Sequence, residues 1–318
     1  MTRAARAGNQ RITRFCGSAS SRTSFLTRRH LLQGGTAAFL GLTGLPAAAD
    51  TGGLDRQILA VSGDSRTARK ALVLTPRRPP PKGGYPTLVL FHGLAETTNP
   101  ELGLRAWADR YGLVAADERL RRGSVAAPTP NRYLTEARAA AIDAELRTRP
   151  YRGFVVVCPF TPNVYEGGAT IMALDRYASW VTDALLPAVR RAAPVRPDPM
   201  STRVDGCSLG GYVALEVFLR KPEFFGAVGG VQSAYGERMA LVYARRLRET
   251  LGRVGPRAIH IETSVWDPSL KAHRILNDEL RRAGVDSDLT VLPGGHDQNF
   301  LREVGALEML LWHDRRTS

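Results

Sequence analysis

Apolar residues follow two alternating patterns along most of this chain: short continuous runs, and longer stretches with helical spacing. The runs TLVLFHG (87–93) and GFVVVCPF (153–160) are apolar almost throughout, which is typical of strands covered on both faces of a sheet. Strands are expected at 56–61, 70–75, 87–93, 153–160, 203–208, 226–233, 257–263 and 288–294. Helices are expected near 101–112, 132–147, 173–193, 210–221, 236–252, 269–284 and 299–312.

The alternation of strands and helices after residue 87 indicates parallel crossover units. The sequence therefore predicts an α/β fold of three layers with a mostly parallel central sheet. A Gly-Asp turn signal between 56–61 and 70–75 adds an N-terminal antiparallel hairpin. We expect one domain over 50–318, and the arginine-rich segment near 115–150 is the best candidate for a lid or cap insertion.

The first 49 residues have the layout of an export signal peptide. They hold seven arginines and no acidic residue, and a weakly apolar segment (36–45) leads to three alanines at 47–49. The Arg28-Arg29 pair resembles a twin-arginine signal, so the twin-arginine export machinery is the expected partner of the precursor. Because about 20 apolar residues are needed to span a bilayer, we expect no stable membrane span. The mature protein is expected to be exported, to the periplasm or outside the cell.

The formal charge of the chain is +14, from 44 basic and 30 acidic side chains. Without the seven arginines of the first 49 residues, 37 basic residues remain against 30 acidic ones, a net charge of +7. These charges are scattered, and no basic run carries interleaved aromatic residues. A nucleic-acid partner is therefore not expected.

Outside the first 49 residues the chain has two cysteines, Cys158 and Cys207, too few for a disulfide framework. Each lies near the end of an apolar run, where a free cysteine acts as a small buried hydrophobic residue. A bridge between the two is left as the alternative, because exported proteins meet an oxidising environment. No Cys and His spacing indicates a zinc site, so we expect no metal.

The stretch Gly206-Cys207-Ser208-Leu209-Gly210 lies where a predicted strand turns into a predicted helix. Glycines on both sides remove side chains that would clash in so sharp a turn, which is the nucleophile-elbow pattern. Such a turn exposes the serine hydroxyl above the carboxyl edge of the sheet, beside the positive end of the helix. The sequence therefore predicts Ser208 as a nucleophile.

A serine hydroxyl needs a base within hydrogen-bond reach, and the base needs an orienting carboxylate. His296 follows the last predicted strand on a Gly-Gly loop, which can carry its ring toward Ser208. Asp267 lies just beyond the preceding predicted strand, which gives the chain order Ser, Asp, His. Glu262, inside that strand, and Asp297, beside the base, are the alternative acids.

Attack on an ester carbonyl creates an oxyanion, which needs preplaced hydrogen-bond donors. The predicted donors are the backbone amides of Leu209, directly after the serine, and of Leu94, in the loop after 87–93. His92 is expected to support this loop by hydrogen bonding rather than to act as a base. Structural roles are also expected for the other three histidines beyond residue 49, His260, His273 and His313.

The sequence resembles the α/β-hydrolases, and within them the esterase D-like or putative esterase family, in four stretches: LVLFHGLAE, YASWVTDALLPAV, VDGCSLGGYVALEVFLRKPEFFGAVGGVQSA and VLPGGHDQNFLREVGALEMLLW. This resemblance implies the three-layer α/β-hydrolase fold and a serine hydrolase that acts on esters without a metal or organic cofactor. It places the triad on Ser208, Asp267 and His296. Cys207 and the SVWDP context of Asp267 depart from the pattern expected for the family. The arginine-rich insertion around 115–150 matches no pattern of the family, which leaves pocket shape and acyl-chain preference open.

The leading interpretation is an exported carboxylic-ester hydrolase that forms an acyl-enzyme on Ser208. Its expected substrate is a small-molecule or carbohydrate-linked ester, with Trp266, Tyr165 and Gln298 as candidate pocket residues. Two alternatives stay open. One is an acyltransferase in which an alcohol or sugar replaces water, and the other is a non-catalytic binding protein with the same fold.

Overall fold

The computed structural model describes residues 53–63, 70–126, 133–166 and 170–317. The predicted signal peptide (1–49) lies outside the described residues, as do residues 127–132 of the predicted insertion. No helix within the described ranges is both long enough and apolar enough to cross a membrane.

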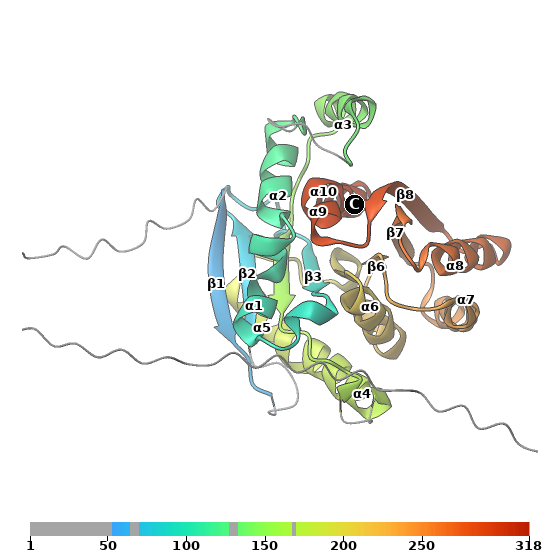
Figure 1. Ribbon diagram of the computed structural model, residues 1–318. Coiled ribbons are helices and arrows are strands. Elements are labelled where there is room, and N and C mark those ends of the chain that lie inside the picture. The colour runs from blue at the N-terminus through green and yellow to red at the C-terminus, as the bar shows by residue number, and fades with distance from the viewer. Residues whose placement is uncertain (1–52, 64–69, 127–132, 167–169, 318) are drawn as a thin grey trace, which may run out of the picture. The chain divides into compact units, whose positions relative to one another are not determined.

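In the described part of the chain, eight strands form one sheet in the order β1-β2-β4-β3-β5-β6-β7-β8 (Figure 1). Strands β1 and β2 pair antiparallel, β2 pairs antiparallel with β4, and all other neighbours are parallel. The predicted α/β class, the mostly parallel sheet and the N-terminal hairpin are thus confirmed. The strands are β1 Leu54–Ala60, β2 Lys70–Pro76, β3 Thr87–Phe91, β4 Val155–Pro159, β5 Thr202–Gly206, β6 Ala227–Val231, β7 Ala258–Trp266 and β8 Ser287–Gly295.

Helices cover both faces of the sheet and complete the three layers (Figure 1). The longer helices are α1 Pro100–Arg105, α2 Leu113–Arg122, α3 Glu136–Thr148, α4 Thr170–Trp180, α5 Leu186–Ala192, α6 Leu209–Arg220, α7 Glu237–Val254, α8 Leu270–Arg282 and α10 Ala306–Arg315. Single turns and π-helical segments are η1 Leu94–Glu96, η2 Ala106–Arg110, η4 Val181–Leu185, η5 Pro199–Ser201, η6 Pro222–Phe224, α9 Gln298–Phe300 and η7 Leu301–Gly305. Helices α4 to α8 share one core with the sheet, whereas α2, α3 and α10 share the other.

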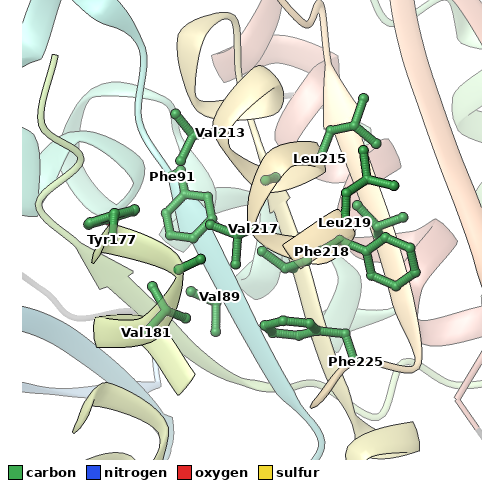
Figure 2. Close-up of a cluster of buried hydrophobic side chains, with 14 of the residues drawn as sticks. Val89, Phe91, Tyr177, Val181, Val213, Leu215, Val217, Phe218, Leu219 and Phe225 are labelled. Carbon is green, nitrogen blue, oxygen red and sulfur yellow. The ribbon is translucent and has the colours of Figure 1, made fainter. Parts of the chain in front are cut away.

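Helix α6 packs closely into the first core, with ten of its twelve residues buried (Figure 2). Val213 and Val217 lie against the buried β3 residues Val89 and Phe91, and Phe218 is also completely buried. Each such side chain contributes roughly 1.5–3 kcal/mol when it leaves water. Because nearly every side chain of α6 is held in this way, the start of the helix, and with it Ser208, is fixed in space.

The structure corrects the predicted elements at 113–122, and π-helical segments interrupt the helices predicted at 101–112, 173–193 and 299–312. Residues 113–122, expected as polar insertion, form α2, which buries Leu113, Ala116 and Leu120 against the second core. Its charged residues stand among the apolar ones, and Asp117 and Arg119 are themselves buried, so the average polarity of the helix hid its apolar spacing. The predicted single helix 173–193 contains a π-helical segment just before Pro187, because proline has no N–H for the regular helical hydrogen bond.

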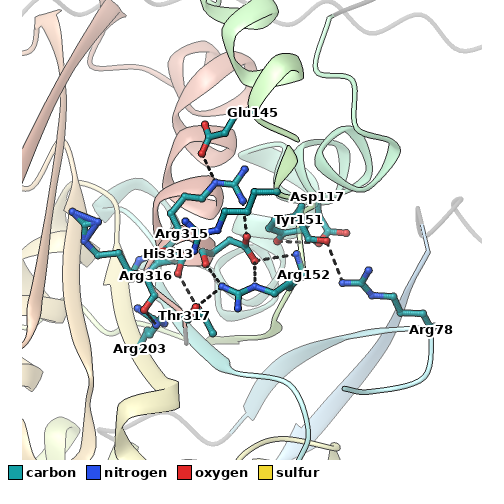
Figure 3. Close-up of polar contacts among 12 residues, drawn as sticks. Arg78, Asp117, Glu145, Tyr151, Arg152, Arg203, His313, Arg315, Arg316 and Thr317 are labelled. Carbon is teal, nitrogen blue, oxygen red and sulfur yellow. Dashed lines mark hydrogen bonds and ion pairs between the residues drawn. The ribbon is translucent and has the colours of Figure 1, made fainter. Parts of the chain in front are cut away.

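Polar contacts fix the C-terminal end of α10 at the amino edge of the parallel strands (Figure 3). Arg152 lies just before β4. Its backbone amide donates to Asp314 Oδ1 (3.0 Å), and its guanidinium donates to the Asp314 carbonyl (2.5 Å). On β5, Arg203 donates to the carbonyl of Arg316 (2.6 Å). These contacts hold α10 against β4 and β5, and Ser208 lies just beyond the opposite end of β5.

Candidate active site

Ser208 occupies a strained turn between β5 and α6. Its φ of 53° lies in the left-handed region, which costs a non-glycine residue roughly 1–3 kcal/mol. The turn is so tight that a Cβ on Gly206 would lie 2.4 Å from the carbonyl carbon of Gly210. A Cβ on Gly210 would lie 2.1 Å from the Phe91 oxygen. Only glycine fits at both positions, which is the local geometry that the elbow pattern predicts.

His296 and Asp267 each follow the last residue of a strand, β8 and β7 respectively, and both reach the serine's edge of the sheet. The Nε2 atom of His296 lies 3.0 Å from the Oγ atom of Ser208. On the other side of the ring, Nδ1 lies 3.1 Å from Oδ1 of Asp267. The structure therefore brings together the three residues predicted from the sequence, as one hydrogen-bonded chain from hydroxyl to carboxylate.

The Asp267 carboxylate is buried and receives three hydrogen bonds. Thr263 Oγ1 donates to Oδ2 (2.5 Å), and the Ser269 amide donates to Oδ1 (2.9 Å) beside His296. Burial alone would raise the pKa of Asp267, but the hydrogen bonds from His296, Thr263 and Ser269 outweigh burial and lower this pKa below its ordinary value. The group is therefore a carboxylate at neutral pH and can orient an imidazole.

The alternative acids lie elsewhere. Glu262 is completely buried inside β7, with Oε2 3.4 Å from Nε2 of His260 rather than near His296. Asp297 accepts a hydrogen bond from the Phe300 amide (2.9 Å) and so caps α9. Neither carboxylate contacts the His296 ring.

Two backbone amides flank the serine at the positions predicted for an oxyanion hole. Leu209 is the first residue of α6, and Leu94 is the first residue of η1, directly after Gly93. The Gly93 amide is already occupied, because it donates to the hydroxyl of Tyr111 (3.2 Å), which in turn donates to Glu96. In contrast, no hydrogen bond from the Leu94 or Leu209 amide is found within the ranges that the structure describes.

His92 supports this loop from below. Its Nε2 atom accepts a hydrogen bond from the Thr161 amide (2.8 Å), and its Nδ1 atom lies 2.9 Å from the Gly93 carbonyl. Burial lowers the pKa of His92 to about 4, against a smaller opposing effect of the Gly93 carbonyl. The ring is therefore neutral at physiological pH and links β3 to the segment after β4.

A cleft of about 260 Å³ opens above these groups. Gln298, one of the three predicted pocket residues, lines this cleft, whereas Tyr165 and Trp266 do not, and their side chains are 51% and 71% exposed. No described residue of 115–150 lines the cleft, and a lid role for that segment stays a prediction. The lining residues are Gly93, Leu94, Ala95, Glu96, Arg110, Tyr111, Cys207, Ser208, Gln232, His296, Asp297, Gln298 and Leu301.

Both described cysteines, Cys158 and Cys207, are free and buried.

A second polar cluster lies buried below the elbow. Oδ2 of Asp205 lies 2.8 Å from Nδ1 of His260 and 2.8 Å from Nε2 of His313. These donor and acceptor atoms lie within 4.8 Å of one another, as metal ligands would, but separations of 2.8 Å are those of direct hydrogen bonds. Burial would lower the pKa of His260, but the charge and hydrogen bond of Asp205, with Glu262, outweigh burial and raise this pKa to about 9. The cluster is therefore a buried ion pair between Asp205 on β5 and His260 on β7, to which His313 links α10 by a hydrogen bond.

Two residues of the site are not apparent from sequence alone. Tyr111 ends a helical segment, and Gln232 follows β6, so neither lies in a recognisable catalytic motif. The one local signal at Gln232 is its place directly after an apolar strand, where the carboxyl edge of the sheet begins.

The strand order, the elbow and the Ser-His-Asp chain are those of the α/β-hydrolase fold. Residues 150–307 match the family described as "Putative esterase".

The chain is similar to one curated relative, the "Uncharacterized protein YbbA" of Bacillus subtilis (strain 168). The two are 26% identical over 153 residues, which cover 44% of this chain and 61% of that protein.

Solved structures share the fold at low sequence identity. A ferulic acid esterase superimposes with a TM-score of 0.58 at 18% identity, covering 83% of this chain and 98% of that one. S-formylglutathione hydrolase (FrmB) from Staphylococcus aureus superimposes with a TM-score of 0.52 at 13% identity, covering 81% and 96%. The ferulic acid esterase of Anaeromyces mucronatus gives 0.53 at 12% identity, covering 83% and 90%. At these identities the likenesses show the shared fold alone.

Proposed function

We propose that this protein is a serine carboxylic-ester hydrolase that forms an acyl-enzyme on Ser208. The observation that carries the proposal is the hydrogen-bonded chain from Ser208 Oγ through His296 to Asp267. Such a chain activates a hydroxyl that is otherwise a weak nucleophile, because the imidazole removes its proton as the new bond forms.

The reaction has two halves. Ser208 Oγ attacks the ester carbonyl carbon, its proton passes to His296 Nε2, and the oxyanion accepts hydrogen bonds from the amides of Leu94 and Leu209. The intermediate collapses as the carbon–oxygen bond to the alcohol breaks and His296 returns the proton to the leaving oxygen. A water molecule then attacks the acyl-enzyme with the same base, which releases the acid and restores Ser208. Throughout, the Asp267 carboxylate holds the ring and stabilises its positive charge.

The size of the cleft supports a small acyl group. Sites for drug-sized ligands commonly measure about 300–1,000 Å³, and the cleft of about 260 Å³ lies below that range. We therefore propose short-chain or single-ring acyl esters, either small molecules or carbohydrate-linked, as substrates. A series of p-nitrophenyl esters from acetate to octanoate, with methyl ferulate as a ring-bearing probe, tests this choice. Highest kcat/KM for octanoate would contradict it.

The catalytic serine is tested by Ser208→Ala, with Ser124→Ala as the matched control. Ser124 is an exposed residue whose hydroxyl contacts Asp143 (3.3 Å), remote from the cleft. Ser208→Ala is expected to lower kcat for p-nitrophenyl acetate by about 10⁴-fold or more, whereas Ser124→Ala keeps the wild-type rate. Equal rates for all three proteins would exclude the proposed hydrolase.

Export is the second part of the proposal and is supported by the Arg28-Arg29 pair and the alanines at 47–49. In a bacterium with a twin-arginine pathway, the full chain is expected outside the cytoplasm with a new N-terminus near residue 50. A variant with lysine at both positions, Arg28→Lys with Arg29→Lys, is expected to stay in the cytoplasm uncleaved. Equal export of both proteins would contradict a twin-arginine signal.

A further inference from the structure

Gln232 lies beside the nucleophile elbow at the end of β6. The residue before it, Val231, accepts a hydrogen bond from the Ser208 amide (3.0 Å), and Ala234 donates to the Ser208 carbonyl (2.9 Å). The side chain of Gln232 is 98% buried, yet it lines the active-site cleft together with Ser208 and His296. Its position is therefore fixed by the same backbone that fixes the serine.

The backbone of Gln232 is strained. Its φ is 51°, and among the described residues only Gln232 and Ser208 have a positive φ without being glycine. Strain of this kind persists only where the surrounding structure enforces it, and it concentrates at functional sites. Here its effect is to turn the Gln232 side chain across the carboxyl ends of β7 and β8.

Both N–H groups of the Gln232 side-chain amide are used in that direction. Nε2 donates to the hydroxyl of Ser264 on β7 (2.7 Å) and to the carbonyl of Gly295 on β8 (2.7 Å). Ser264 is also linked to the acid, because its carbonyl accepts a hydrogen bond from the Asp267 amide (3.2 Å). Gly295 directly precedes His296. One side chain thus contacts the segment that carries the acid and the segment that carries the base.

The segment that carries the base needs such support. His296 follows two glycines, and its side chain is 33% exposed, so the place of the ring depends on its hydrogen bond with Asp267 and on the backbone that precedes it. A displacement of about 1 Å between reacting groups can lower a rate by about 100-fold. The Gly295 carbonyl accepts hydrogen bonds from the Gln232 amide and from the Ser264 hydroxyl (3.2 Å). These bonds fix the backbone directly before His296.

We propose that Gln232 is a positioning residue that holds the His296 segment in register with Ser208 through the Gly295 carbonyl. This inference rests on the proposed function, in which His296 is the base. Gln232 takes no part in bond making. It acts by keeping the Nε2 atom of His296 at 3.0 Å from the serine hydroxyl.

The test uses Gln232→Gly, because glycine accepts a positive φ without strain and so preserves the backbone while removing the amide. The thermal midpoint is expected to stay within a few degrees of wild type. For p-nitrophenyl acetate, kcat is expected to fall by about 10- to 100-fold with KM changed by less than about twofold, since the proposed role of Gln232 is to position the base rather than to bind substrate. Gln232→Asn, whose shorter amide cannot reach Gly295, provides a second variant with side-chain polarity kept, and a similar loss is expected.

Two further proteins isolate the role. Gln57→Ala removes an exposed glutamine of β1, at the edge of the sheet farthest from β8, and is expected to keep the wild-type kcat. In a His296→Ala background, Gln232→Gly is expected to change the residual rate by less than about twofold, because the group that it positions is gone. An equal loss in both backgrounds would show that Gln232 acts independently of His296 and would overturn the proposal.

Ser208→Ala separates this proposal from the proposed function. If Ser208→Ala is inactive and Gln232→Gly keeps the wild-type kcat, the positioning role is wrong while the hydrolase stands. If Ser208→Ala is as active as wild type, the hydrolase is wrong and the positioning role falls with it.

Discussion

The Nδ1 atom of His260 lies 2.8 Å from the Oδ2 atom of Asp205, although β6 runs between the strands that carry these residues. The β6 residue at this level is Gly229, which has no side chain to fill the gap. His313 reaches the same oxygen from α10. The Asp205 carboxylate, three positions before Ser208, is thus held by His260 and by His313. This buried cluster depends on the absence of a side chain at Gly229.

Gly229→Ala is expected to destabilise the fold strongly. A Cβ at this position would lie 2.0 Å from Asp205 Oδ2 and 2.7 Å from the Cβ of His260, so the buried ion pair must open. Separating such a pair leaves uncompensated buried charge, which costs about 3–5 kcal/mol of unfolding free energy. Urea denaturation measures this loss.

The matched control is Gly252→Ala in α7, where no atom lies within 4 Å of the added carbon. This change is expected to stabilise the protein by about 0.5–1 kcal/mol, because alanine favours helix. A Gly229→Ala protein as stable as wild type would show that Asp205 and His260 do not need the gap.

Asp267→Asn tests the orienting acid. The amide keeps the shape of the carboxylate but replaces one acceptor oxygen with an NH₂ group, which at Oδ2 faces the Thr263 hydroxyl and at Oδ1 removes the acceptor of the Ser269 amide and of His296 Nδ1. The ring is then held in the wrong tautomer, and kcat is expected to fall by about 10³- to 10⁴-fold. Asp278→Asn, an exposed change on α8, is the control and is expected to keep the wild-type rate. A loss below about tenfold for Asp267→Asn would assign the orienting role to another group.

Tyr111→Phe tests the support of the oxyanion loop. The change removes the hydroxyl that accepts from the Gly93 amide and donates to the buried Glu96. Two buried polar groups lose a partner, so stability is expected to fall by about 1–3 kcal/mol. Because Leu94 follows Gly93, its amide also moves relative to the serine, and kcat is expected to fall by about tenfold.

The control for this change is Tyr85→Phe at the amino edge of the sheet. The Tyr85 hydroxyl is buried too and contacts the carbonyls of Arg78 and Pro79 (3.1 Å each). If both variants lose similar stability but only Tyr111→Phe lowers kcat, the result would support the role of Tyr111 in holding the oxyanion loop. Equal kcat values for the two variants would contradict it.

The sequence predicted the groups whose identity and place are set locally. Ser208, Asp267 and His296 each follow a strand, and their residue types and chain order limit what they can do together. Gln232 and Tyr111 escaped prediction because their roles depend on which strands become neighbours. The order β3-β5-β6-β7-β8 places Gln232 between the serine and the two strands that carry acid and base, and no local pattern encodes that order. Helix α2 was missed for a different reason, since its charge outweighed its apolar spacing.

His273 makes the stability of the fold depend on pH. Its ring is completely buried on α8, with Nδ1 3.6 Å from Oδ2 of Asp267. Burial lowers the pKa of His273 from 6.5 to about 4, although the charge of Asp267 acts in the opposite direction. Between pH 6.5 and 4 the unfolded chain therefore binds a proton that the folded chain does not, so the free energy of unfolding falls as the pH falls.

For one such histidine this loss amounts to about 3 kcal/mol between pH 7 and pH 4. Urea denaturation of wild type and His273→Gln at both pH values isolates it, because every other titrating group is common to the two proteins. Relative to wild type, the glutamine variant is expected to gain about 3 kcal/mol on going from pH 7 to pH 4, whatever its stability at pH 7. If the difference between the two proteins stays constant with pH, then the ring is protonated in the folded state as readily as in the unfolded one, and burial does not control its charge.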